Sequence, residues 1–136
     1  MAVLWTPDLA TGNATIDAEH KELFAAINRV MEACSKGQGR AVLEETIRFM
    51  ESYVEKHFNH EEQLQQKCKY PDYVNHKKWH EGYKKVVAEI DAQIRKEGPS
   101  IALVGKVNAQ IAGALATHIK TEDKKLAAFM KSQGVS

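Results

Sequence analysis

Four long stretches of the chain carry apolar side chains at alternating steps of three and four residues. They cover residues 16–34, 43–68, 73–94 and 101–118. This spacing keeps one face of an α-helix apolar, and its strict alternation is typical of helices packed side by side. In the fourth stretch the predicted stripe consists of Ile101, Val104, Asn108, Ile111, Leu115 and His118. We therefore expect four long helices, each with one face in a shared core.

Glycine and proline separate these stretches. Gly37 and Gly39 follow the first, Pro71 precedes the third, and Gly98 and Pro99 precede the fourth. Short turns join helices that are neighbours in a bundle. The predicted fold class is therefore all-α: an antiparallel up-down-up-down four-helix bundle with an N-terminal arm and a short C-terminal helix, in a single domain over residues 1–136.

The ends of two helices carry residues that suit helix termini. Asp17 is the predicted N-cap of the first helix, because its carboxylate can accept backbone N–H groups that lack a helical partner. Gly37 or Gly39 can end that helix. Pro99 is predicted to lie in the first turn of the fourth helix.

Composition limits the classes of function that need to be considered. The 136 residues are 43% hydrophobic and 27% charged, with a formal net charge of +1. No apolar run approaches the roughly 20 residues that a membrane helix needs, and the basic residues are dispersed, which argues against a nucleic-acid partner. Residues 1–10 lack the pattern of a secretory signal. We expect a cytoplasmic protein, or a domain taken from a larger one, with Cys34 and Cys68 as small buried residues.

Six polar residues occupy positions on the stripes where a core residue is expected: His20, His57, Glu61, His76, His80 and His118. Burying one such side chain without a hydrogen-bonding partner or a bound ion costs roughly several kcal/mol. His57 and Glu61 are four residues apart, as are His76 and His80, so each pair shares one helix face. His60 lies off the stripe and is predicted to be a partly exposed residue that binds no metal. The pattern predicts a metal site between the helices.

Asp123 is a further candidate ligand with unfavourable spacing. It follows His118 by five positions, which on a regular helix places it about 140° away around the axis. It can join the His118 site only if the helix breaks or distorts near residues 120–122. We predict such a break, followed by a short terminal helix that carries Leu126, Phe129 and Met130.

These residues also carry a family resemblance. The chain resembles bacterial hemerythrins and hemerythrin-like domains over nearly its whole length. The matching segments are Asp17-x-x-His20, His57-x-x-x-Glu61, His76-x-x-x-His80 and His118-Ile119-x-x-x-Asp123, with Trp5 and Tyr70-Pro71 in addition.

The resemblance implies a cofactor of two iron ions with a bridging oxo or hydroxo group. In hemerythrins one iron takes three histidines, which here would be His76, His80 and His118. The other takes two, here His20 and His57, and keeps an open position at which dioxygen binds end-on. Glu61 and Asp123 would bridge the two irons. Neutral imidazoles and carboxylates suit first-row metals, but spacing alone does not select iron over zinc or copper.

Reversible dioxygen binding requires an apolar pocket that excludes water and proton donors. Leu23, Phe58, Leu115 and Ile119 are predicted to line this pocket, because each lies within one helical turn of His20, His57 or His118. The chain departs from the family at Ala114, where oxygen-carrying hemerythrins tend to have tryptophan. A smaller residue there implies a wider channel and faster autoxidation.

Three functions fit these features. The leading hypothesis is a dioxygen-binding protein, acting as a carrier, store or sensor, with dioxygen as partner and no catalytic residues. The first alternative is a di-iron enzyme that reduces peroxide or nitric oxide. Its ferritin-like form is disfavoured, because those enzymes use Glu-x-x-His ligation and this chain has His-x-x-x-Glu. The second alternative is a sensory domain excised from a larger signalling protein. The sequence indicates no particular protein partner.

Overall fold

The computed structural model describes residues 5–37, 40–98 and 100–134, and these residues are almost entirely helical. Three long helices come first: α1 (Ala14–Ser35), α2 (Arg40–Lys67) and α3 (Tyr73–Glu97). A fourth long segment is continuous but mixed, and it consists of α4 (Ile101–Lys106), η2 (Val107–Gly113), α5 (Ala114–His118), η3 (Ile119–Asp123) and α6 (Lys124–Ser132). Both η2 and η3 are π-helical. The predicted all-α class is confirmed, since the described residues contain no strand.

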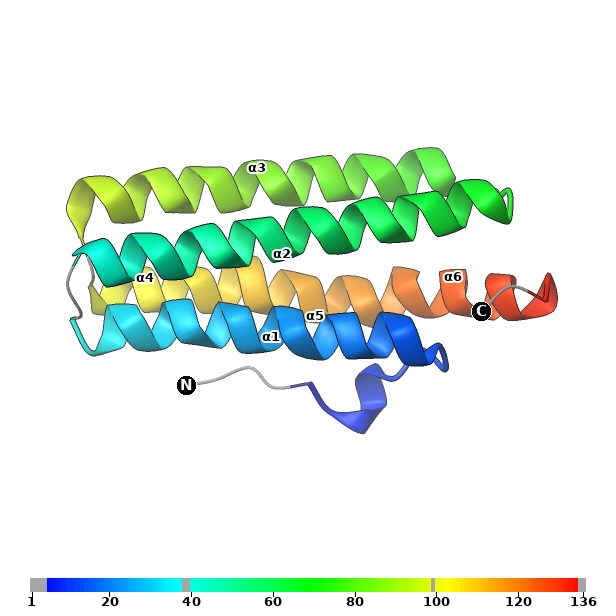
Figure 1. The fold of residues 1–136 in the computed structure, drawn as a ribbon, viewed down its shortest axis with the longest axis horizontal. Coiled ribbons are helices and arrows are strands. Elements are labelled where there is room, and N and C mark those ends of the chain that lie inside the picture. The colour runs from blue at the N-terminus through cyan, green and yellow to red at the C-terminus, as the bar shows by residue number, and fades with distance from the viewer. Residues whose placement is uncertain (1–4, 38–39, 99, 135–136) are drawn as a thin grey trace.

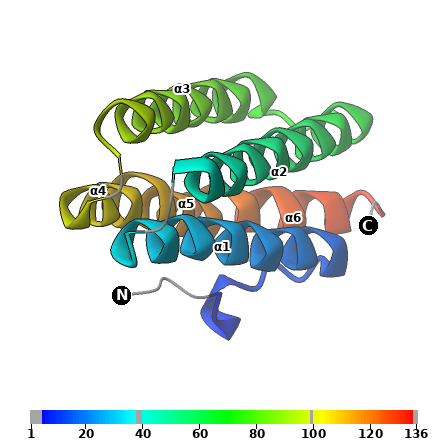
Figure 2. The same ribbon diagram turned by 60° about the vertical axis from the view of Figure 1, so that its left-hand side comes forward.

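The four long segments lie side by side, and successive segments are joined at alternate ends of the molecule (Figures 1 and 2). Helix α1 packs against α2 and against α4 and η2, while α3 packs against α2 and η2. An N-terminal arm with one 3-10 turn, η1 (Pro7–Leu9), runs along the outside of α1 (Figure 1). Leu9 in this turn is buried, so the arm covers part of the bundle.

Asn13 and Gly37 mark the two ends of helix α1. Its N-cap is Asn13, whose side chain accepts a hydrogen bond from the Ile16 N–H, so the predicted capping role of Asp17 is wrong. Asp17 instead lies inside the helix and accepts hydrogen bonds from the backbone N–H and hydroxyl of Thr11, at 2.9 and 2.8 Å. This contact ties the N-terminal arm to α1. Gly37, at φ +61°, ends the helix as predicted, because the left-handed region is open to glycine; Gly39 lies outside the described residues.

In the first three segments the predicted stripes lie in the core, except that Leu64 and Tyr73 are only partly buried and the Leu43 side chain lies outside the part that the structure describes. The beginning of the fourth stripe differs. Ile101 is 72% exposed, whereas Leu103 and Val107 are buried. The π-helical segment η2 explains the error, because its i→i+5 hydrogen bonds place more residues in each turn than an α-helix. If α-helical spacing is assumed over the whole segment, residues that share a face with His118 after η2 do not share it before η2. The predicted stripe therefore lies on an exposed face at Ile101. Helix α4 is capped by the Ser100 side chain, and Pro99 lies outside the described residues.

The apolar core consists of two parts separated by polar side chains. The larger cluster fills most of the bundle and includes Leu23, Phe58 and Ile119. The smaller cluster consists of Ile16, Cys68, Tyr70, Leu126 and Met130. His20, Glu61 and Asp123 each lie in sequence between a member of the larger cluster and a member of the smaller one. Cys34 and Cys68 are both buried and free, as predicted.

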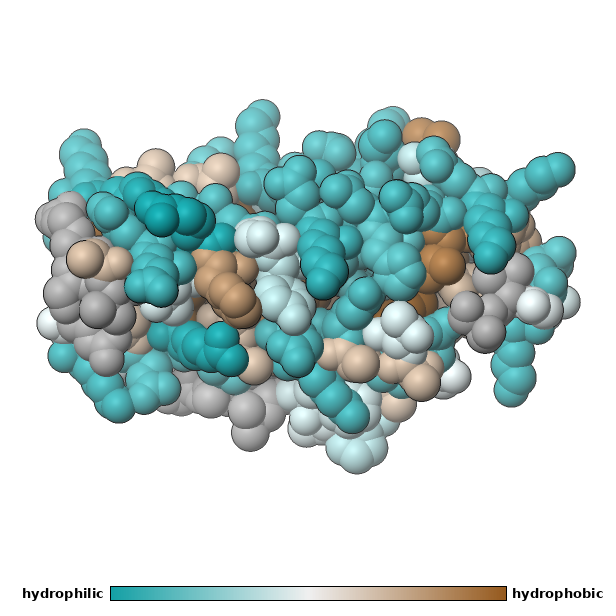
Figure 3. All heavy atoms as spheres, viewed as in Figure 1, coloured by the Kyte–Doolittle hydropathy of each residue, from teal (hydrophilic) through white to brown (hydrophobic). Residues whose placement is uncertain are grey.

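The outer surface has no large apolar area on the face that Figure 3 shows. Hydrophilic side chains cover most of this face, and hydrophobic ones are scattered between them (Figure 3). Among the described helices, none combines the length and the apolar character needed to cross a membrane.

Candidate metal centre

All seven candidate ligands converge inside the bundle. His20 comes from α1, His57 and Glu61 from α2, and His76 and His80 from α3. The last two, His118 and Asp123, end α5 and η3. Each of the seven is at most 3% exposed. The structure therefore brings together the complete set predicted from the sequence, from every long segment of the bundle.

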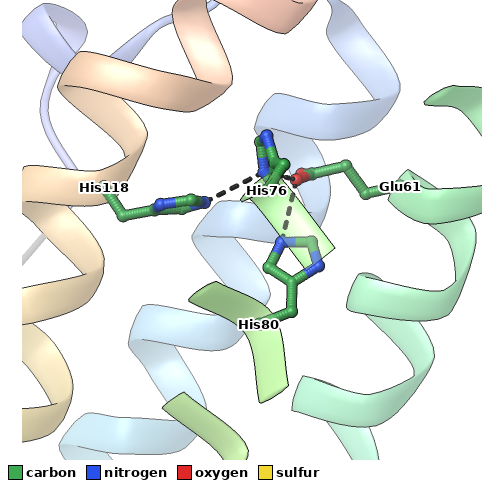
Figure 4. Close-up of side chains that lie close together, drawn as sticks. All are labelled: Glu61, His76, His80 and His118. Atoms are coloured by element: carbon green, nitrogen blue, oxygen red, sulfur yellow. Dashed lines mark hydrogen bonds and ion pairs between the residues drawn. The ribbon is translucent and has the colours of Figure 1, made fainter. Parts of the chain in front are cut away.

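These side chains form two groups that share one residue. The first group is Glu61, His76, His80 and His118, and the second is His20, His57, Glu61 and Asp123. In each group, one potential ligand atom per residue lies within 4.8 Å of all the others. Figure 4 shows the first group, with His76 and His80 turned toward the Glu61 carboxylate and His118 approaching from the opposite side. This geometry suits two neighbouring cations better than one.

The Glu61 carboxylate lies between the two groups, with one oxygen facing each. Its Oε1 atom is 2.8 Å from Nε2 of His76 and 3.2 Å from Nε2 of His80. Its Oε2 atom is 3.1 Å from Nε2 of His57. A carboxylate that divides its oxygens in this way is positioned to bridge two ions.

The Asp123 carboxylate also lies between histidines of the two groups. Its Oδ1 atom is 3.0 Å from Nε2 of His76 and 3.1 Å from Nε2 of His118, and its Oδ2 atom is 3.0 Å from Nε2 of His20. Asp123 therefore contacts histidines of both groups, as Glu61 does.

Most of these close contacts are not hydrogen bonds. The Nε2 atoms of His20, His57 and His80 and both oxygens of Glu61 are buried without a hydrogen-bond partner. They lie near one another but are not aligned as donor and acceptor. In addition, the Nε2 atoms of His76 and His118 face each other at 3.1 Å. Buried polar groups rarely remain unpaired, and lone pairs directed at shared points are what bound cations require. The donor set of five imidazoles and two carboxylates fits a pair of iron ions.

Asp123 reaches the site through a distortion of the helix rather than through the predicted break. Residues Ile119–Asp123 form the π-helical turn η3, and backbone angles remain in the right-handed helical region from Ile119 (φ −59°, ψ −47°) to Lys124 (φ −64°, ψ −38°). A π-turn pairs residue i with residue i+5, so residues five apart come onto nearly the same face. The α-helix then resumes as α6, which carries Leu126, Phe129 and Met130 as predicted.

Two carboxylates outside the cluster orient two of the histidines. Glu19 accepts a hydrogen bond from Nδ1 of His57 at 2.9 Å, and Glu62 accepts one from Nδ1 of His80 at 2.9 Å. These bonds fix the tautomer that leaves Nε2 free for a metal. Neither carboxylate was predicted to take part in the site, although each is adjacent in sequence to a predicted ligand. His60 also contacts Glu19, at 3.0 Å, and its side chain is 34% exposed, as expected for a residue outside the cluster.

Two aromatic rings stack on the histidines of the first group. Phe58 lies on His80, with ring centroids 3.8 Å apart and planes 4° apart. Trp79 lies on His118, with centroids 3.6 Å apart and planes 9° apart. Trp79 was not predicted, and its position immediately before His80 is the feature of the sequence that points to it. Ala114 is partly buried against the core.

The four predicted pocket residues are enclosed. Leu23, Leu115 and Ile119 are 0% exposed and Phe58 is 1% exposed. All four belong to the larger apolar cluster, which adjoins the metal centre. These four side chains are therefore shielded from solvent.

The charges of the cluster stabilise one another in the metal-free protein. Burial by itself lowers the pKa of His57, but the carboxylates of Glu19 and Glu61 raise it to about 10. Burial also opposes protonation of His76, and Asp123 and Glu61 raise its pKa to about 9. Burial raises the pKa of both Glu61 and Asp123, yet the surrounding histidines hold each well below its usual value. The carboxylates therefore favour protonation of these imidazoles, and a metal ion that binds there would have to displace the protons.

Comparison with known proteins identifies similar sequences. A family described as the hemerythrin HHE cation binding domain matches residues 11–130. A bacteriohemerythrin of Stenotrophomonas maltophilia is 31% identical over 133 residues, which cover 97% of this chain and 84% of that protein. A bacteriohemerythrin of Pseudomonas aeruginosa is 34% identical over 64% of this chain and 56% of its own length. One of Campylobacter jejuni is 24% identical over 92% of both chains.

Proposed function

Because this chain belongs to the hemerythrin family, we propose that it is a non-heme di-iron protein that binds dioxygen reversibly, as a carrier, store or sensor. The observation that carries the proposal is the pair of buried groups that share Glu61. One group has three histidines and the other two, so the two metals would differ in the number of protein ligands. In keeping with the family, we infer an antiparallel up-down-up-down bundle.

The proposed ligands follow the two groups. His76, His80 and His118 would hold one iron, and His20 and His57 the other. Glu61 and Asp123 would bridge them, together with an oxo or hydroxo group from solvent. The divided contacts of both carboxylates, at 2.8–3.2 Å from histidines of each group, support this assignment. The three-histidine half would then be coordinatively complete, and the two-histidine half would keep one open position.

When bound, the iron pair supplies the electrons and the open position that dioxygen binding requires. The residues of the chain control what else reaches that position. We propose that Leu23, Phe58, Leu115 and Ile119 line the dioxygen pocket, and their exposure of 0–1% supports this role. In these enclosed positions they would keep water and added proton donors away from the iron pair. Glu19 keeps Nδ1 of His57 engaged, so that Nε2 of this histidine faces the metal.

The test is an absorption spectrum with iron analysis, before and after exposure to air. We expect about two irons per chain and uptake of about one dioxygen per two irons. The oxygenated protein should be coloured and should lose its dioxygen under vacuum. A reduced, iron-loaded protein that stays colourless in air would refute dioxygen binding. Rapid repeated consumption of peroxide or nitric oxide in the presence of a reductant would instead support the enzyme hypothesis.

A further inference from the structure

A surface pocket reaches one of the candidate ligands from outside the bundle. It has a volume of about 160 Å³ and is formed by the beginning of α3 and by η3, with Asp72, Asn75, His76, Trp79 and Glu122 as its lining. Liquid water occupies about 30 Å³ per molecule, so the pocket has room for a metal ion with some of its water ligands. At this pocket the buried cluster comes close to solvent.

Apart from His76, the charged residues of the pocket are acidic. Asp72 is the N-cap residue of α3, but its side chain makes no capping contact with the backbone and instead accepts a hydrogen bond from the Asn75 amide, at 2.8 Å. The Glu122 side chain is 33% exposed, and its ion pair with the exposed Lys125 spans 3.9 Å, so solvent screens that lysine. Among the described residues that line the pocket there is no lysine or arginine. The pocket therefore attracts cations.

His76 connects this pocket to the buried cluster. The residue is 2% exposed. Its Nε2 atom faces the carboxylates of Glu61 and Asp123, at 2.8 and 3.0 Å, and these carboxylates balance the charge of a proton on the ring. Its Nδ1 atom is buried without a hydrogen-bond partner, whereas the Nδ1 atoms of His57 and His80 donate to outer carboxylates. No hydrogen bond on its second nitrogen therefore restrains the His76 ring.

A second surface pocket reaches the other half of the centre but suits cations less well. It also has a volume of about 160 Å³, and it contacts His57. Two carboxylates line it, Glu19 and Glu22, but so does Lys56, whose charge opposes the approach of a cation. In addition, Glu19 accepts a hydrogen bond from Nδ1 of His57 at 2.9 Å, so this imidazole is already held from outside.

We propose that the pocket between Asp72 and Glu122 is the entry site through which ferrous ions reach the buried centre. The inference rests on the proposed function, because it takes iron as the metal of the centre. Asp72 and Glu122 attract the ion from solvent, and His76 is the first imidazole that it meets. Carboxylates suit hard ions such as Mg²⁺ and Mn²⁺, whereas imidazole suits iron. A ferrous ion held by the pocket carboxylates therefore gains affinity when it moves inward to the histidines.

The first experiment measures how fast the metal-free protein takes up cobalt(II), an air-stable divalent ion whose visible absorption rises when histidine nitrogens bind it. Cobalt is kept at low concentrations, where the rate is proportional to cobalt. We expect Asp72→Asn/Glu122→Gln to load about tenfold more slowly than the wild-type protein and to reach the same final cobalt content. Both substitutions keep the size of the side chain, and asparagine is as good an N-cap residue as aspartate.

The matched control is Glu89→Gln/Glu97→Gln, which removes the same charge from exposed positions of α3 that do not line the pocket. It should load at the wild-type rate, because only the local charge of the pocket guides the ion. Added salt should slow loading of the wild-type protein more than loading of Asp72→Asn/Glu122→Gln. Equal rates in the two double variants would overturn the proposal.

A second pair of variants adds one charge instead of removing two. Asn75→Lys places a cation in the pocket, while Val74→Lys places one at a neighbouring position that is 63% exposed and does not line it. Asn75→Lys should load about tenfold more slowly than Val74→Lys, and equal rates would contradict entry at this pocket.

Final iron content and dioxygen uptake test the proposed function separately, because both are measured at equilibrium and neither depends on the route of entry. A protein that binds no iron at equilibrium would refute the proposed function. Normal iron binding together with unchanged loading rates in the pocket variants would refute the entry site alone.

Discussion

In each half of the metal centre an outer carboxylate orients one histidine, Glu19 for His57 and Glu62 for His80, but the aromatic rings around the histidines differ between the halves. In the three-histidine half, Phe58 and Trp79 stack on His80 and His118 within 4 Å. In the two-histidine half, no described aromatic ring stacks face to face on a histidine, and the Glu19 carboxylate orients His57. Flat aromatic contacts restrict ring rotation and occupy the space around the ligands. The two-histidine half, where we propose that dioxygen binds, is therefore the half whose histidines have no aromatic ring stacked on them.

The largest effect is expected where the two halves meet. Glu61→Gln keeps the size of the side chain but removes the charge that both groups share, so both halves should fail together. We expect the iron content to fall from about two per chain to less than about 0.2, measured by metal analysis of the purified protein. Glu55→Gln, at an exposed position of the same helix, is the control and should retain its iron. Retention of one tightly bound iron in Glu61→Gln would mean that the halves are independent.

Removing the metal should destabilise the whole bundle. The unpaired atoms of the cluster are buried, and only bound cations satisfy all of them. If the free metal concentration is about a thousand times Kd, metal binding stabilises the folded protein by about 4 kcal/mol. This corresponds to an increase in Tm of roughly 10–20 °C. Calorimetry of the chelated and reloaded protein measures this difference. An identical Tm for both forms would contradict this prediction, because it would mean that protons stabilise the buried cluster as well as metal ions do.

Substituting the outer carboxylates should separate the two halves. Glu19→Gln weakens the orientation of His57, and Glu62→Gln does the same for His80. Each should lower metal affinity by about 10- to 100-fold, Glu19→Gln in the two-histidine half and Glu62→Gln in the three-histidine half. Competition with a coloured chelator gives both affinities, and dioxygen uptake shows which half is affected. If the two variants lose the same iron, the assignment of ligands to halves is wrong.

The smallest effect concerns a carboxylate pair outside the centre. Glu61 and Asp123 face histidines, which lower their pKa. Glu51 instead faces Asp91, and burial together with this like charge raises the pKa of Glu51 to about 7. The unfolded chain releases that proton near its ordinary pKa of 4.5, so folding becomes less favourable as pH rises from about 4.5 to 7.

Glu51→Gln should remove this cost. It should therefore raise Tm at pH 8 by about 1–2 °C and change it less at pH 4.5, because at that pH Glu51 is protonated in the folded protein and half protonated in the unfolded chain. Thermal unfolding at the two pH values checks the sign. The expected size is small because Glu51 is partly exposed and solvent screens its charge. A larger gain at pH 4.5 than at pH 8 would contradict the prediction.

The sequence by itself determined which residues lie on the same face of a helix. His57 with Glu61, and His76 with His80, share a face because residues four apart always do so on an α-helix. The same rule placed His20 and His118 on buried stripes, and the structure brings all of them together. These positions depend on the helix itself, so no knowledge of its neighbours was needed.

Tertiary structure decided the features that depend on neighbouring helices or on departures from α-helical spacing. The π-turn Ile119–Asp123 brings Asp123 to the cluster, and the second π-segment moves Ile101 to the surface and Val107 into the core. Glu19 contacts His57 across 38 positions of sequence, and Trp79 contacts His118 across two helices. Sequence periodicity fixes which face of a helix is buried, but not which residue of another helix lies against it, because that depends on how the helices are rotated and offset in the packed core.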